Sequence, residues 1–200
     1  MKKVLIIVDY QKDFVVGKLG FDKAIALDKG LNAKLKEYLD DPDGIVILTL
    51  DSHRKSYLKT LEGRKLPIEH CIMGTDGHDW YGETGETIRG CYEKYAEYIG
   101  SYDRCAAKTD KENLYIVTKN TFGSMELGDL LMELNSENGL EEIALCGIVT
   151  NMCVISNAVV AKAACPSVEI NVLSDLVASF DDELHQKALD VMEGMQINVV

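Results

Sequence analysis

The sequence predicts an α/β protein, a three-layer fold in which helices cover both faces of a six-stranded, mostly parallel sheet. Short runs of β-branched and aliphatic residues, typical of strands buried on both faces, recur along the chain. Segments with apolar residues at helical spacing separate most of these runs. This alternation is typical of a parallel sheet with helical crossovers. We expect residues 1–200 to form a single domain with an irregular region at about 54–112.

The first two strands lie on either side of the first helix. Residues 3–8 and 45–50 are buried apolar runs, and each stops at an aspartate. Residues 22–39 predict a helix whose apolar face carries Leu27, Leu31, Leu35 and Tyr38. The Asp-Pro-Asp-Gly turn at 41–44 then leads the chain into the second strand.

Residues 54–112 lack a clear period and are rich in glycine and polar residues. A loop of this length inside a compact domain is usually functional. Part of 86–99 could be helical, and the pattern leaves the rest unassigned. The sequence does not decide whether residues 82–112 form a lid or a segment of an interface.

The second half of the chain returns to regular alternation. The pattern predicts strands at 114–118, 142–147, 168–173 and 197–200. Three helices separate them. The first is capped by Ser124 and carries Leu127, Leu130, Leu131 and Leu134; the second spans 151–164; the last is capped by Ser179 and carries Leu184, Ala188, Val191 and Met192.

Composition excludes several classes of protein. The net charge of −12, without a lysine or arginine cluster, argues against a nucleic-acid surface. No apolar run approaches the ~20 residues of a membrane span, and the five-residue run at the N-terminus is too short for a signal peptide. Six cysteines without a secretion signal favour reduced thiols and a cytoplasmic location.

Reactive side chains follow four of the predicted strands. They are Asp9, Asp51 with His53, Lys119, and Cys153. In parallel α/β sheets, ligands bind beyond the carboxyl ends of the strands. We therefore expect these groups to meet at one edge of the sheet.

Cys153 falls in the first turn of the helix predicted at 151–164, which Thr150 or Asn151 could cap. Unpaired N–H groups and the helix dipole there should bring the thiol pKa below the roughly 8.5 of a free cysteine. The alternative is a buried cysteine that packs as a small apolar side chain.

Three of these groups form a chemically consistent set. Lys119 can stabilise a Cys153 thiolate, and Asp9 can carry protons, which suggests acyl transfer from an amide through a thioester. His185 belongs to the last helix and is expected to lie far from the strand ends, so a Cys-His pair is not predicted.

The Asp51-x-His53 pair indicates an open divalent-metal site. His70 is the candidate third ligand and His78 is its rival. The alternative is that Asp51 and His53 only stabilise a turn.

Together these motifs resemble the isochorismatase-like cysteine hydrolases, and most of all the nicotinamidases. The resemblance rests on the following segments, which occur in the family's order: Asp9-Tyr-Gln-Lys-Asp13-Phe14, Asp51-Ser-His53, His70-Cys-Ile-Met-Gly74-Thr75, Lys119-Asn-Thr-Phe122 and Gly147-Ile-Val-Thr150-Asn-Met-Cys153-Val154.

The resemblance implies roles for particular residues. It implies a catalytic triad of Asp9, Lys119 and Cys153, and a metal on Asp51, His53 and His70 that holds the pyridine nitrogen of nicotinamide. It also implies a cis peptide between Ile148 and Val149, with an oxyanion hole formed by the N–H groups of Val149 and Cys153. Phe14 and Phe122 are expected at the substrate; an ordinary core position is the alternative for Phe14.

The chain also departs from the nicotinamidases. These enzymes often carry an aromatic residue shortly before the metal histidine, where this chain has Leu66-Pro67-Ile68-Glu69. Some relatives add a glutamate ligand, for which Glu62 and Glu69 are both candidates.

The leading prediction is a nicotinamidase that releases nicotinate and ammonia in NAD salvage. It would act on a small-molecule amide, assemble as a homo-oligomer as relatives do, and use one divalent metal, with zinc as first choice and iron or manganese as alternatives. The first rival is a family member acting on another amide, carbamoyl or ureido substrate. The second is a non-catalytic binding protein, which the glycine-free segment after the first strand disfavours.

Overall fold

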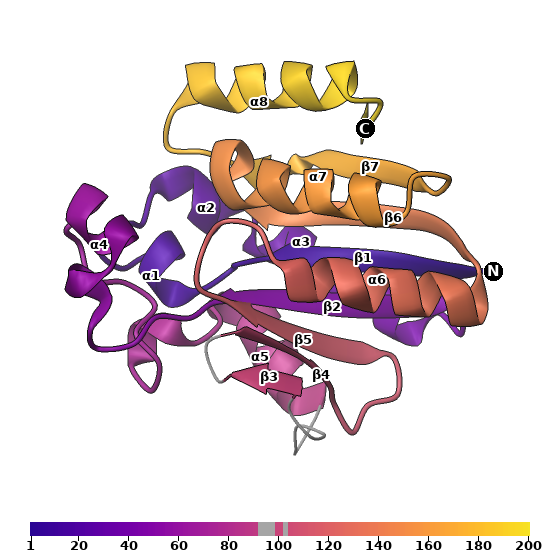
Figure 1. The fold of residues 1–200 in the computed structure, drawn as a ribbon, viewed down its shortest axis with the longest axis horizontal. Coiled ribbons are helices and arrows are strands. Elements are labelled where there is room, and N and C mark those ends of the chain that lie inside the picture. The colour runs from indigo at the N-terminus through magenta and orange to yellow at the C-terminus, as the bar shows by residue number, and fades with distance from the viewer. Residues whose placement is uncertain (92–98, 102–103) are drawn as a thin grey trace.

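An eight-stranded sheet forms the centre of the computed structural model, which describes residues 1–91, 99–101 and 104–200. The strand order is β3-β4-β5-β2-β1-β6-β7-β8 (Figure 1). The six parallel strands are β1 (Lys2–Val8), β2 (Gly44–Asp51), β5 (Leu114–Lys119), β6 (Leu140–Ile148), β7 (Glu169–Ala178) and β8 (Asn198–Val199). The predicted α/β fold with a mostly parallel sheet is therefore confirmed.

The predicted number of strands was too low. Two short antiparallel strands, β3 (Ile99–Ser101) and β4 (Arg104–Lys108), extend the sheet beyond β5. Both lie in the region that the sequence left irregular. In β4 the only buried residues are Cys105 and Ala107, an alternation too short to stand out in a polar segment.

Helices cover the two faces of the sheet (Figure 1). On one face lie α6 (Met125–Asn138), α7 (Ile155–Ala164) and α8 (Asp182–Gly194), and on the other lie α3 (Asp28–Asp40) and α5 (Gly82–Cys91). Successive strand residues point to opposite faces, so β1 supplies Val4, Ile6 and Val8 to one core and Leu5 and Ile7 to the other.

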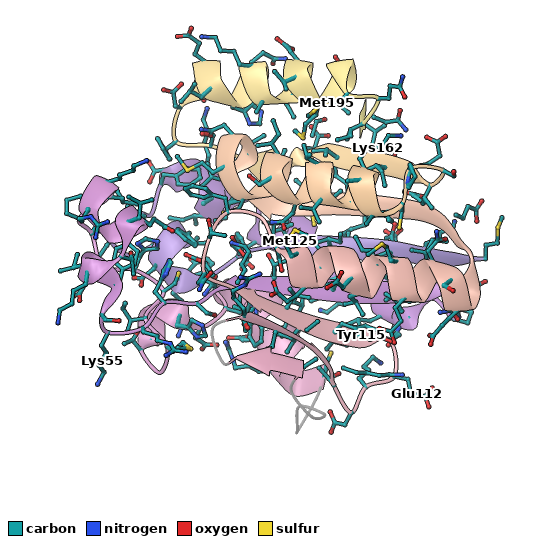
Figure 2. The ribbon with its side chains drawn as sticks, in the orientation of Figure 1. Lys55, Glu112, Tyr115, Met125, Lys162 and Met195 are labelled. Atoms are coloured by element: carbon teal, nitrogen blue, oxygen red, sulfur yellow. The ribbon has the colours of Figure 1, made fainter. Side chains whose placement is uncertain are left out.

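Shorter helices gather at the carboxyl ends of the strands. These are α1 (Lys12–Val15), α2 (Asp22–Ala26) and α4 (Leu61–Lys65), with the 3₁₀ turns η1 (Tyr57–Lys59) and η2 (Asp76–His78). In Figure 2, Lys55 lies at this end of the molecule, whereas Glu112 and Tyr115 lie at the opposite end, where β5 begins. Among the described residues, no helix is both long enough and apolar enough to cross a membrane.

Two predictions about helix boundaries were wrong. The segment 22–39 forms two helices, α2 and α3, that meet at Leu27. The last helix is capped by the side chain of Asp181, which accepts a hydrogen bond from the Leu184 N–H, and not by Ser179. Part of 86–99 is helical, as expected: α5 begins at Gly82 and includes residues 86–91, while residues 92–98 lie outside the described part of the chain.

The apolar face of α6 yields a stability prediction. Leu131 is fully buried in the core between α6 and the sheet, and its neighbour Met132 is half exposed. We expect Leu131→Ala to lower the free energy of unfolding by about 2–5 kcal/mol because it leaves a cavity. Met132→Ala should cost less than about 1 kcal/mol. Urea unfolding of both variants tests this, and equal losses would contradict the described orientation of α6.

Candidate active site

The carboxyl ends of four parallel strands bring the predicted side chains together. Asp9 follows β1 directly and has a left-handed backbone, with φ at 47°. Asp51 and Lys119 are the last residues of β2 and β5 and are register partners in the sheet. Cys153 lies in the turn after β6. All four side chains are buried.

Lys119 lies between the Asp9 carboxylate and the Cys153 thiol. Its Nζ is 2.6 Å from Asp9 Oδ2 and 3.5 Å from Cys153 Sγ, and it donates a hydrogen bond to the Thr121 carbonyl at 3.0 Å. The other Asp9 oxygen, Oδ1, accepts a hydrogen bond from Thr49 Oγ1 at 2.7 Å. A carboxylate, an ammonium and a thiol thus form one buried contact group.

The pKa of Cys153 is shifted in the direction opposite to the sequence prediction. Burial raises the pKa of the Cys153 thiol well above its usual range, and the Lys119 charge opposes this only in part. Burial also raises the pKa of Asp9, again against the lowering effect of Lys119. The expected low pKa is therefore wrong for this structure, because burial outweighs the nearby cation. As a nucleophile, this thiol would therefore need a base to accept its proton.

The turn that carries Cys153 is a π-helical turn, Thr150–Val154, which leads into α7. Neither predicted cap side chain caps the helix. Thr150 Oγ1 lies 2.9 Å from His185 Nδ1, and Asn151 Oδ1 accepts a hydrogen bond from Ser179 Oγ. The expectation that His185 lies far from the strand ends is also wrong, because α8 packs against this turn.

The backbone before this turn is unusual. The peptide bond between Ile148 and Val149 is cis, as the family resemblance implied. Gly147 has φ at 106°, and a Cβ there would lie 2.2 Å from the Val8 carbonyl oxygen. Glycine therefore lets β6 approach β1 closely just before the turn.

Asp51, His53 and His70 form a group that could hold a metal ion, with one ligand atom from each lying within 4.8 Å of the others. Asp51 Oδ2 is 2.9 Å from His53 Nε2 and 3.3 Å from His70 Nε2. Ligands about 2.0–2.1 Å from a tetrahedral zinc lie about 3.3 Å apart, so this spacing fits. Among the described residues, the buried His53 Nε2 makes no hydrogen bond of good geometry although Asp51 Oδ2 lies 2.9 Å away, which suits two atoms that share a metal ion.

Neighbouring groups distinguish the candidate ligands. The His70 ring has its Nδ1 2.8 Å from the Ile68 carbonyl oxygen, which leaves Nε2 facing the cluster. His78 lies outside the cluster, and its Nε2 is 2.7 Å from Ser52 Oγ. Glu62 Oε1 lies 3.7 Å from His53 Nε2 and 3.9 Å from His70 Nε2. Of the two candidate glutamates, Glu62 is therefore the one placed at the edge of this group.

Sequence reasoning missed a buried glutamine that holds Asp51 in place. The Gln11 side chain is fully buried, accepts a hydrogen bond from the Asp51 N–H at 2.8 Å and donates to the Asp51 carbonyl at 2.9 Å. It also donates to the His78 carbonyl. Its position in the segment after the first strand was visible in the sequence, but its partners were not.

A cavity of about 310 Å³ opens beside both groups. Its polar side contains Cys153, Asp51, His70 and Glu62. The remaining lining is largely apolar and includes Phe14, Leu19, Leu66, Phe122, Ile148, Val149, Met152 and Phe180. Leu66 thus lines the cavity in the segment where the family often has an aromatic residue, and Phe14 and Phe122 are both cavity residues.

Comparison with known proteins gives a consistent result. Residues 105–200 match the model of the isochorismatase domain. The chain is 31% identical to an uncharacterized isochorismatase family protein, PncA, from Bacillus subtilis (strain 168), over 94% of this chain and 93% of that protein. It is 27% identical to the nicotinamidase/pyrazinamidase of Mycobacterium tuberculosis (strain ATCC 25618 / H37Rv), over 99% and 98% of the two chains.

Solved structures share the fold over the whole chain. The crystal structure of nicotinamidase/pyrazinamidase PncA from Bacillus subtilis gives a TM-score of 0.81 at 24% identity, covering 100% of both chains. That of the Pyrococcus horikoshii pyrazinamidase in complex with zinc gives 0.73 at 20% identity, covering 100% of this chain and 99% of that one. Taken with the 31% identity across nearly its full length, this shows that the chain belongs to the isochorismatase family.

Proposed function

We propose that the protein is a nicotinamidase that hydrolyses nicotinamide to nicotinate and ammonia. The observation that carries this proposal is the contact group of Asp9, Lys119 and Cys153, which shares one cavity with the Asp51, His53 and His70 cluster. The similarity to the Mycobacterium tuberculosis nicotinamidase/pyrazinamidase supports it.

The cavity lining favours a neutral aromatic amide. Its walls are mainly apolar and aromatic, which suits a flat ring. Among the described residues, the carboxylates that line it are those of Asp51 and Glu62, and none of these lining residues is lysine or arginine. A carbamoyl or ureido substrate with its own carboxylate would meet no lysine or arginine here, and only the proposed metal ion could pair with it. This disfavours those alternative substrates that carry a carboxylate.

In the proposed first step, Cys153 Sγ attacks the amide carbon of the substrate. Asp9 accepts the thiol proton and delivers it to the departing nitrogen, so that ammonia leaves and a thioester remains. The high pKa of Cys153 makes this base necessary, and the high pKa of Asp9 suits a carboxylate that both accepts and donates a proton. Lys119 offsets the negative charge shared by Asp9 and the sulfur.

In the second step, water attacks the thioester carbon and Asp9 accepts its proton. Nicotinate then leaves and Cys153 regains its thiol. In both steps a negative charge develops on the substrate oxygen. We assign its stabilisation to the N–H groups of Val149 and Cys153, two residues that line the cavity.

Asp51, His53 and His70 would hold one divalent ion, with zinc first and iron or manganese as alternatives. When bound, the ion supplies a Lewis acid that can hold the pyridine nitrogen. Gln11 fixes the backbone of Asp51, and the Ile68 carbonyl oxygen beside Nδ1 orients the His70 ring. Phe14 packs against His70, with ring centroids 5.4 Å apart, and offers a face to the substrate ring.

We place this reaction in NAD salvage. All six cysteines are free, which supports a reducing compartment such as the cytoplasm. Assembly as a homo-oligomer remains part of the proposal.

The nucleophile assignment predicts the effect of Cys153→Ala. Ammonia release from nicotinamide should fall by more than about 10⁴-fold, because no other group can form the thioester. Zinc binding, measured by calorimetry, should keep the stoichiometry of the wild type. Cys91→Ala, which changes a half-buried cysteine in α5, is the matched control and should keep full activity. Substantial turnover by Cys153→Ala would rule out this nucleophile.

The metal assignment predicts that chelation abolishes ammonia release and that added zinc, iron or manganese restores it. His70→Ala should weaken zinc binding by more than about 100-fold, because it removes a ligand. The loss of a residue that only hydrogen-bonds to a ligand lowers metal affinity by up to about 100-fold. His78→Ala changes a histidine outside the cluster and should bind zinc nearly as the wild type does. Ammonia release that is unchanged by chelators would refute the metal site. It would leave the proposed cysteine mechanism intact.

A further inference from the structure

The sheet does not place Lys119 next to Cys153 directly. Lys119 ends β5 and Cys153 follows β6, and the strand order puts β2 and β1 between them. At about 4.8 Å per strand, β5 and β6 lie roughly 14 Å apart. Lys119 Nζ and Cys153 Sγ are nevertheless 3.5 Å apart. Their separation therefore depends on how the segments beyond the strand ends are held together.

A single buried amide joins those segments. Asn157, in the first turn of α7, is fully buried. Its Nδ2 donates to the Cys153 carbonyl at 2.8 Å and to the Phe122 carbonyl at 3.0 Å. Its Oδ1 accepts a hydrogen bond from the Ser124 N–H at 3.1 Å. Both amide hydrogens and the oxygen are thus used on main-chain groups.

The loop at 120–124 is the link to Lys119. This loop connects β5 to α6, and its Thr121 carbonyl accepts the hydrogen bond from Lys119 Nζ. Asn157 holds the loop at two main-chain points, Phe122 and Ser124, and holds the turn of the nucleophile at a third. The helices that follow the two segments, α6 and α7, lie side by side in Figure 1.

We propose that Asn157 is a positioning residue that sets the separation of Lys119 and Cys153. It touches neither the substrate cavity nor the Asp51, His53 and His70 cluster among the contacts described. The expected effect of Asn157 on kcat for nicotinamide rests on the proposed function. Its expected effect on the distance between Lys119 Nζ and Cys153 Sγ does not. Asn157 lies outside the motifs that carry the family resemblance, so its role was not predictable from the sequence.

The first test is Asn157→Asp, which keeps the size of the side chain and the acceptor for the Ser124 N–H. It replaces the amide donor by an oxygen that faces two carbonyl oxygens, so the loop and the turn should separate. We expect kcat for nicotinamide to fall about 100-fold, the effect of misplacing reacting groups by about 1 Å. The dissociation constants for zinc and nicotinate should change by less than about threefold.

Asn32→Asp is the matched control. Asn32 is a buried asparagine of α3, on the other face of the sheet, and its Oδ1 accepts a hydrogen bond from Thr87. This variant carries the same chemical change and should keep kcat within about threefold of the wild type at the same assay temperature. A loss of kcat in Asn32→Asp equal to that in Asn157→Asp would overturn the proposal, because general destabilisation would then explain both.

A crystal structure of Asn157→Asp tests the geometry without any assumption about the substrate. The expected result is a Lys119 Nζ to Cys153 Sγ distance longer by about 1 Å. If that distance stays unchanged, the proposal fails even if nicotinamide is hydrolysed. If the wild type does not hydrolyse nicotinamide but the distance lengthens as expected, the proposed substrate fails and the positioning role stands. If Asn157→Asp does not fold, Asn157→Ser replaces it in both measurements. We again expect a lower kcat and a longer distance between Lys119 Nζ and Cys153 Sγ.

Discussion

One buried ammonium group links the two halves of the site. Lys119 is almost fully buried, and its Nζ lies 2.6 Å from the Asp9 carboxylate and 3.9 Å from that of Asp51. Two buried carboxylates this close to one another destabilise each other's charge, and the cation compensates both. Burial alone would lower the pKa of Lys119, but the nearby Asp9, Cys153 and Asp51 outweigh it and leave this pKa above its usual range. The contact group of Asp9, Lys119 and Cys153 and the candidate metal cluster depend on the same charge.

The parallel sheet explains why these residues can meet. Its strands all end at one edge, so β1, β2, β5 and the turn after β6 deliver a carboxylate, a second carboxylate, an ammonium and a thiol to a small volume. Register fixes Asp51 beside Lys119, while loops fix the rest. Side chains that hydrogen-bond to the main chain, such as Gln11 and Asn157, hold these segments together.

The residues at this edge were predictable because each one follows a recognisable strand. The α/β class followed from the same alternation, and the motif that resembles the family also anticipated the cis peptide at Ile148. What failed depended on three-dimensional surroundings. The pKa of Cys153 follows from burial by distant segments, and the His185 contact follows from the packing of α8. β4 was missed because its buried alternation spans only two side chains.

The most direct test of the account is the chemical state of Cys153 during turnover. The enzyme would be mixed with nicotinamide, quenched in acid within the first turnovers, and digested for mass spectrometry. The expected result is a nicotinoyl group on the peptide that contains Cys153 and on none of the other five cysteines. Steady ammonia release without any acylated Cys153 peptide, under conditions that preserve a synthetic thioester standard, would contradict the covalent mechanism at its centre.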